Sequence, residues 1–196
     1  MPIYVNGGEA GKLYMMGNPP LQIGKVYRKD AGGSSLIYSG GTSLLGQFSF
    51  LDESYVNVNG SLTQTDSSMT LYAQARAGYA GGMAHAYTQP IDVSGFGQIS
   101  VNVTEFESAN RIKLCRFGLA ASLDAAKTAG TFYGQGNAKA LGFPIAYADI
   151  TGTGSFVCDI PAGTGSAVVI LAFGTEYLGG SSGSIHHVTL DSFVLE

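Results

Sequence analysis

Residues 85–107, HAYTQPIDVSGFGQISVNVTEFE, decide the fold class of this chain of 196 residues. Pro90 leads into a short apolar run at 91–93, and the small turn SGFG follows at 94–97. The next residues alternate and place Ile99, Val101 and Val103 on one side, because successive side chains of a strand point to opposite faces. This pattern predicts a strand of an antiparallel sandwich, with one face toward a core.

Similar short β-prone runs recur along the chain, separated by Gly, Ser or Asp at roughly the 8–12 residue spacing of a sandwich. We expect strands at 44–50, 55–61, 69–75, 83–88, 98–106, 111–120, 154–160, 167–173 and 185–195. Nine such strands predict an all-β, antiparallel jelly-roll β-sandwich. The continuous apolar run at 168–173 predicts a strand that is buried on both faces.

Composition supports this class and excludes others. The chain has 29 Gly, only 12% charged residues and a net charge of −4. Glycine-rich, weakly charged sequence favours short strands and tight turns over helices. With no cluster of Lys or Arg, the sequence argues against nucleic-acid binding. We also expect no secretory signal and no membrane span, because no run approaches about 20 apolar residues.

Two further local patterns have structural consequences. Cys115 and Cys158 each lie in an apolar alternating run, which favours buried free thiols over a disulfide or a metal pair. Residues 121–150 interrupt the strand pattern, and Ser122 can cap a short helix that runs through Lys127. The glycine-spaced aromatic segment GTFYGQGN at 130–137 follows as part of the longest insertion between the expected core strands.

The phrase AYTQPIDVSGFGQISVNV at 86–103 resembles a segment of carbohydrate-binding-like jelly-roll modules, in which a loop-bound Ile-Asp pair precedes a long central strand. The closing strand at 185–196 and the segments VCDIP and VVILAF before it resemble the final strands of the same sandwiches. The resemblance covers residues 42–196 and implies an architecture, but no particular ligand.

Residues 1–41 differ from the rest of the chain, with a charge balance of +2 over the first 40 residues against −6 over the remaining 156. Asn6-Gly7 and the glycines at 32–33 predict tight reversals between short strands, so we expect a small β-hairpin module. The stretch IYVNGGEAGKLYMMGNPPLQIGKVYRKDAGGSSLIYSGG at 3–41 resembles the N-terminal pieces of tailed-bacteriophage structural proteins. An ordinary hairpin extension is the alternative interpretation.

We therefore expect two domains, a docking and assembly module at 1–41 and the sandwich at 42–196. A hairpin module of this size cannot bury its own apolar residues, so it should pack on a second copy or on other virion proteins. A homo-oligomer is expected on this basis.

Sugar binding requires an exposed aromatic ring with polar groups around it. The chain has no Trp but has 11 Tyr and 10 Phe, and some lie in glycine-flanked loops where packing explains them less well. Core packing remains the alternative role for each ring. The predicted glycan-binding residues are Phe132, Tyr133, Tyr177, Glu176 and Tyr79.

The resemblance to carbohydrate-binding-like sandwiches also implies one structural calcium ion, because such modules often hold one between an early loop and the last strand. Its ligands would be Asp52, Glu53 and Asp191, whose carboxylate oxygens suit a hard cation. No other cofactor is expected.

The sequence gives little support for catalysis. Glu105 and Glu107 share one side of a strand, yet nothing marks them as facing each other across a cleft, so we expect solvated carboxylates. His186 and His187 should point to opposite faces of their strand, and His85 is distant in sequence. Neither cysteine lies in a polar loop, as a nucleophilic cysteine would be expected to.

The sequence thus predicts a non-catalytic bacteriophage virion protein, in the tail or on the head surface, whose sandwich is displayed for attachment to host-surface glycans. Two alternatives remain open. One is a non-viral carbohydrate-binding module or bacterial adhesin, and the other is a purely structural decoration protein without a ligand.

Overall fold

The computed structural model describes residues 14–15, 21–22, 25–30, 33–39, 41–51, 59–74, 83–107, 112–132, 139–175 and 185–196. The backbone forms two compact units, one of Met1–Thr42 with Glu196 and one of Ser43–Leu195. Each unit is described separately below. The predicted domain boundary after residue 41 falls beside the boundary between these units, while independent folding of the two parts stays a prediction.

The first unit contains two antiparallel strand pairs. β1 (Tyr14–Met15) pairs with β2 (Leu21–Gln22), and β3 (Lys25–Asp30) pairs with β4 (Gly33–Ser39). Asp30 lies opposite Gly33 at the reversal, and a register shift interrupts the β3–β4 ladder between Val26 and Tyr27. An isolated two-stranded pair of this length is only marginally stable in water.

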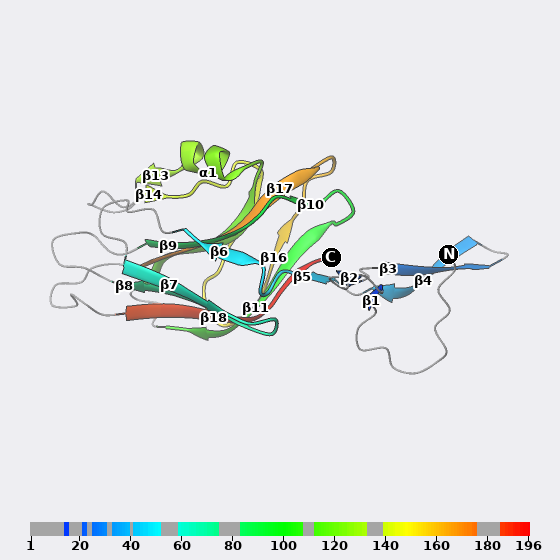
Figure 1. Ribbon diagram of the computed structural model, residues 1–196, viewed down its shortest axis with the longest axis horizontal. Coiled ribbons are helices and arrows are strands. Elements are labelled where there is room, and N and C mark those ends of the chain that lie inside the picture. Colours follow the sequence, from blue (N-terminus) through cyan, green and yellow to red (C-terminus); the bar gives the residue numbers. More distant parts are fainter. Residues whose placement is uncertain are drawn as a thin grey trace. The chain divides into compact units, whose positions relative to one another are not determined.

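The second unit is a sandwich of two antiparallel sheets, which lie one above the other in Figure 1. The first sheet has the order β15 (Ala146–Asp149), β12 (Ile112–Ala120), β17 (Ser166–Thr175), β9 (Met83–Thr88), β6 (Phe48–Phe50), with β10 (Ile91–Asp92) beside β17. The second sheet has the order β16 (Gly154–Asp159), β11 (Gln98–Phe106), β18 (Ile185–Leu195), β8 (Met69–Gln74), β7 (Asn59–Gln64), with β5 (Thr42–Ser43) beside β18. The predicted all-β sandwich is confirmed.

The core lies between the two sheets and is filled by the alternate side chains that the sequence pattern predicts. Ile99, Val101 and Val103 of β11 are at most 2% exposed. Across the interface, Phe117 of β12 meets Phe193 of β18 edge to face, with ring centroids 5.8 Å apart. Such aromatic pairs stabilise a core by about 0.5–1.5 kcal/mol beyond their buried area.

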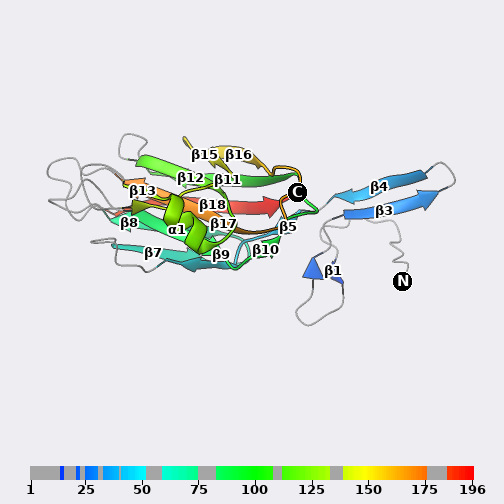
Figure 2. The same ribbon diagram turned by 90° about the horizontal axis from the view of Figure 1, so that it is seen from above.

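The first sheet is also covered on its outer face. α1 (Leu123–Ala129), which lies across the strands in Figure 2, packs with the segment around Leu141 against that face. The resulting second hydrophobic cluster consists of Ala120, Ala126, Leu141, Val168 and Ile170. Residues of β17 from Ala167 to Thr175 are consequently all buried, as the apolar run predicts.

The helix begins as the sequence predicts. Ser122 has an extended backbone, and its Oγ accepts a hydrogen bond from the Ala125 N–H at 3.1 Å, while Asp124 lies in the first turn. Both features favour the positive end of a helix. Beyond the helix, β13 (Thr131–Phe132) pairs with β14 (Lys139–Ala140). Within the described residues, no helix is long and apolar enough to cross a membrane.

Most expected strands match the structure to within one or two residues at their ends, and two differ by more. Residues 55–58, expected at the start of one of these two, lie outside the described residues. Residues 44–47, expected at the start of a strand, form a turn in which Gln47 N donates to Leu44 O at 3.0 Å, and β6 begins only at Phe48. Gly46 has φ +83°, a backbone conformation that favours glycine. β7 extends beyond the expected end to Gln64, because the reversal is made later by Thr65, whose Oγ1 accepts from Ser67 N and Ser68 N.

Edge strand β6 is protected by a side chain rather than by another strand. The Gln64 side chain accepts from Phe48 N at 3.2 Å and donates to Phe48 O at 2.5 Å. This amide bonds both backbone groups of Phe48 that another strand could otherwise pair with. It therefore blocks edge-to-edge pairing at this position.

The edge strand β15 was not expected, because its sequence AYAD has little apolar signal. It pairs with β12 through a close approach at Gly118, which lies opposite Tyr147. A Cβ atom on Gly118 would lie 2.1 Å from Ala146 O and 2.7 Å from Tyr147 Cα. The absence of a side chain at this position is what lets the two backbones approach.

We predict that Gly118→Ala destabilises the sandwich by about 2 kcal/mol, because the added methyl group meets backbone atoms that cannot move without disturbing the ladder. The matched control is Gly152→Ala, where a Cβ would have no atom within 4 Å. Its effect should stay within about 0.5 kcal/mol. Urea unfolding of both variants measures the difference, and equal midpoints would show that β15 adjusts freely.

Candidate functional site

The outer face of the second sheet is the candidate site, and we call it the open face. Alternation along each strand turns one set of side chains into the core and the opposite set outward. The outward side chains are exposed or half-buried, and most are polar. The apolar ones include Val157, Ile185 and Val194. The polar ones include Ser61, Thr63, Thr70, Tyr72, Gln74, Gln98, Ser100, Asn102, Thr104, Glu105, Glu107, Ser155, Asp159, His187, Thr189, Asp191 and Ser192.

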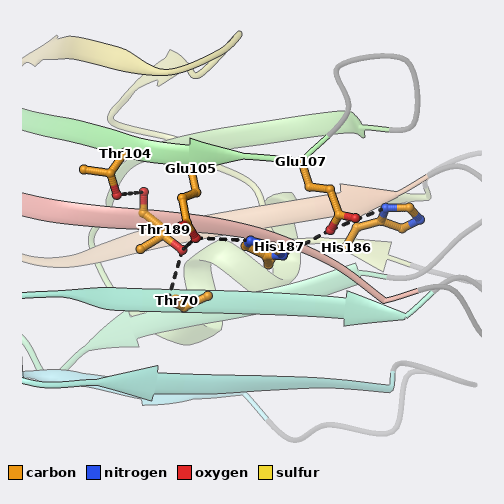
Figure 3. Close-up of polar contacts among 7 residues, drawn as sticks. All are labelled: Thr70, Thr104, Glu105, Glu107, His186, His187 and Thr189. Carbon is orange, nitrogen blue, oxygen red and sulfur yellow. Dashed lines mark hydrogen bonds and ion pairs between the residues drawn. The ribbon is translucent and has the colours of Figure 1, made fainter.

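On the open face, near the start of β18, one imidazole lies between two carboxylates. His187 Nε2 is 3.3 Å from Glu105 Oε2, and His187 Nδ1 is 3.1 Å from Glu107 Oε2. Figure 3 shows the imidazole of His187 on β18 between the side chains of Glu105, on the neighbouring strand β11, and Glu107, which directly follows that strand. Both ring nitrogens therefore face negatively charged oxygen atoms, which fixes the orientation of the ring.

A bulge in β11 arranges these carboxylates. The register shifts between Val103 and Glu105, so that Val103 lies opposite Leu190 and Glu105 lies opposite Thr189. Thr104 and Glu105 are both exposed as a result, although they are neighbours in sequence. A bulge supplies one extra residue on one strand and thereby redirects side chains.

The hydroxyl groups beside the carboxylates form an ordered chain. Thr189 Oγ1 donates to Glu105 Oε2 at 3.0 Å, and Thr70 Oγ1 lies 3.1 Å from Thr189 Oγ1. Because a hydroxyl has one hydrogen and that of Thr189 is used, Thr70 must be the donor to Thr189. Thr104 Oγ1 also donates to the Thr189 backbone oxygen, at 3.3 Å (Figure 3).

An aromatic ring borders this cluster. Tyr72 of β8 lies directly opposite His187 of β18 in the ladder, and the two ring centroids are 5.6 Å apart with the planes tilted by 41°. Tyr72 is half-buried, so part of its ring stays accessible. The open face thus combines an aromatic surface with carboxylates and hydroxyls.

A second polar chain crosses β16, β11 and β18. Asn102 Nδ2 donates to Asp191 Oδ1 at 2.8 Å, and Ser155 Oγ donates to Asn102 Oδ1 at 3.1 Å. Asp191 is the extra residue of a further irregularity, because Asn102 lies opposite Ser192 while Val103 lies opposite Leu190. The Asp191 carboxylate, one of the predicted calcium ligands, is therefore engaged by an amide donor.

The other predicted site residues are only partly described by the structure. Phe132 lies in β13, and its side chain is not described. The remaining ones lie outside the described residues: Tyr79, Tyr133, Glu176, Tyr177, Asp52 and Glu53. The loop glycan site and the calcium site stay predictions. Within the described part of the chain, no group of three His, Cys, Asp or Glu side chains is arranged to hold a metal ion.

The adjacent histidines of β18 point to opposite faces, as predicted. His186 is 3% exposed on the core side, with Nδ1 3.9 Å from Glu107 Oε2, whereas the side chain of His187 is 31% exposed on the open face. Sequence reasoning missed the cluster of His187 with Glu105 and Tyr72. The polar positions of the alternating runs at 98–107 and 185–191 contained the signal, but the pairing register that joins them did not follow from sequence.

His85 has a structural role on the first sheet. It is 5% exposed, and its Nε2 accepts a hydrogen bond from Leu141 N at 3.1 Å. Burial lowers the pKa of His85 to about 4. The neutral imidazole thereby fixes the segment that covers the outer face of the first sheet.

The predicted burial of both cysteines is confirmed. Cys115 is 3% exposed, and burial raises the pKa of its thiol, with a smaller contribution from Asp149. Burial, helped by Asp159, raises the pKa of Cys158 to about 11. Neither side chain forms the thiolate that nucleophilic chemistry requires at neutral pH.

Comparisons with known proteins give little to set beside this geometry. No protein-family model matches the chain, and no curated protein matches it. Among solved structures, the chain is similar to the K1 cleaved adhesin domain of Lys-gingipain from Porphyromonas gingivalis W83. The TM-score is 0.35 and the identity 16%, over 77% of this chain and 98% of that chain. At this level, nothing about the ligand of the present chain follows from the likeness.

We predict that His85 makes the sandwich acid-sensitive. Its pKa is lower in the folded state, so its contribution is fully present above about pH 6.5 and is lost as the pH falls toward 4. The loss should total roughly 3 kcal/mol, and the measurement is the urea midpoint across this window. His85→Gln keeps a hydrogen-bond acceptor but does not titrate. Between pH 6.5 and 4, its urea midpoint should therefore change only through the protonation of carboxylates. If the urea midpoints of the two proteins fell in parallel as the pH was lowered, His85 would not be the source of the acid sensitivity.

Proposed function

We propose that the chain is a non-catalytic recognition module that binds a glycan on the open face. The observation that supports this proposal is the asymmetry of the two sheets. The outer face of the first sheet is closed by α1 and an apolar cluster, whereas that of the second sheet bears ordered polar side chains beside the Tyr72 ring.

The chemistry of the open face suits a sugar. A pyranose presents C–H groups on its ring face and hydroxyls around its edge. The Tyr72 ring offers a surface for the former, while Glu105, Glu107 and the threonine hydroxyls supply partners for the latter. Because these groups are already held by one another, little side-chain entropy is lost on binding.

The same geometry does not favour hydrolysis. Glycosidases place two carboxylates on opposite sides of the scissile bond. Glu105 and Glu107 instead come from one strand segment and contact the same imidazole through their Oε2 atoms. This arrangement holds carboxylates in place for binding, and it supports a protein of the binding class.

A virion component, in tail or head surface, is the second candidate. It is favoured by the separate compact unit of Met1–Thr42, together with the resemblance of residues 3–41 to tailed-phage structural proteins. In this setting the first unit would dock on a second copy or another virion protein, and the sandwich would be displayed. An adhesin or carbohydrate-binding module that is not part of a virion would have the same open face.

The proposal predicts that Tyr72→Ala weakens glycan binding by about 1–3 kcal/mol, the usual cost of removing an interface anchor. The measurement is binding of the full chain to a glycan array, followed by titration calorimetry with a glycan that binds. The matched control is Tyr147→Ala, which removes a 52% exposed tyrosine from edge strand β15 of the other sheet. This control should bind as the unaltered protein does.

Equal loss in both variants would indicate a general effect on folding, which thermal melting would reveal. Unchanged binding in Tyr72→Ala, with loss in Tyr133→Ala, would move the site to the glycine-spaced loop. If no glycan binds, the purely structural alternative is favoured. Mass spectrometry of purified virions from the source strain tests the second candidate separately, since a virion component must be present there.

A further inference from the structure

We infer that the open face selects polysaccharides without acidic groups and excludes those with carboxylate or sulfate groups. This inference rests on the proposed glycan binding and adds the class of ligand. Its basis is the juxtaposition, on one sheet face, of several acceptor-only carboxylates with an aromatic ring, with no Lys or Arg among the described strands of that sheet.

The described strands of the second sheet carry acidic side chains but no Lys or Arg. Its outward side chains include the carboxylates of Glu105, Asp159 and Asp191, and Glu107 directly follows β11. Anionic ligands are normally bound by the forked guanidinium of Arg or by Lys, and the described strands of this sheet supply neither.

The hydrogen-bonding groups that this face leaves available are mainly acceptors. In the described part of the chain, the contacts of Glu105 and Glu107 use the Oε2 atoms, which leaves the Oε1 atoms to accept further bonds. The side chains of these residues are 64% and 40% exposed. The two threonine hydroxyls of the cluster are already used as donors, because Thr189 donates to Glu105 and Thr70 donates to Thr189.

A ligand that fits must therefore donate. Neighbouring sugar hydroxyls can donate to carboxylate oxygens, and such charge-assisted bonds are stronger than bonds between neutral groups. A uronic acid or sulfated sugar would instead bring an anion beside Glu105 and Glu107, where the partly excluded solvent screens the repulsion less than bulk water does. The Tyr72 ring, 5.6 Å from His187, serves both classes equally and so contributes affinity without this selection.

The test compares two neutral polymers, dextran and galactomannan, with two acidic ones, hyaluronate and polygalacturonate, by affinity electrophoresis of the full chain at fixed pH and low salt. At least one neutral polymer should retard the protein, and each acidic polymer should bind at least about tenfold more weakly. Glu107→Gln should weaken the neutral interaction about fivefold to tenfold, because a neutral amide accepts a weaker bond. Glu105→Lys combined with Glu107→Lys should admit the acidic polymers.

The matched control is Asp124→Asn, which removes one exposed negative charge from the first turn of α1, away from the open face. It should leave all four interactions unchanged, and thermal melting shows that each variant is folded. The inference is wrong if an acidic polymer binds, no neutral polymer binds, and Tyr72→Ala abolishes the binding. In that case the proposed glycan function would still stand. Failure of all four polymers together with an empty glycan array would overturn both. Neutral binding that survives both Tyr72→Ala and Glu107→Gln would overturn the assignment to this face.

Discussion

Burial of β17 on both of its faces is the constraint on which the rest of the sandwich depends. Val168 and Ile170 point away from the sheet interface, and Val169, Leu171 and Phe173 point into it, yet all are at most 2% exposed. Fully burying such a side chain contributes about 1.5–3 kcal/mol. The outward set can contribute only if another layer covers it, and this is why the 121–145 insertion supplies α1 and the segment around Leu141. The buried, neutral His85 connects that layer to β9 through Leu141 N.

The second sheet has no described strand that needs a covering layer on its outer face, so this face can carry polar side chains. The strands of this sheet mostly alternate between apolar and polar side chains, so solvent can contact one face without loss of core. Irregularities in the β11–β18 ladder then decide which polar groups meet. The bulge beside Val103 turns Thr104 and Glu105 outward together, and the extra residue Asp191 lies within reach of Asn102. Local departures from regular pairing thus organise the candidate site on a regular scaffold.

Much of the fold follows from the sequence because its strongest signals are local. Alternation at 98–106, the apolar run at 168–173 and the serine cap at 122 each specify an element through residues that are close together in sequence. β15 escaped prediction because alanine gives no clear preference and because its pairing depends on the missing side chain of Gly118, which is distant from β15 in sequence. The candidate site escaped for a similar reason. Glu105, His187 and Tyr72 come from three strands, and their meeting depends on register, which sequence periodicity does not determine.

The asymmetry of the sandwich also has a consequence for how the chain avoids self-association. The strand β6 at one edge of the first sheet has its Phe48 backbone groups taken by the Gln64 amide, and the strand β15 at the other edge places Asp149 outward, where Arg116 contacts it at 2.7 Å. The guanidinium of Arg116 in turn lies 3.9 Å from the Tyr147 ring centroid and covers that exposed side chain. Charged and engaged groups at sheet edges disfavour pairing between copies. Both edges of the first sheet are thus occupied and its outer face is covered, whereas the outer face of the second sheet has no covering layer among the described residues.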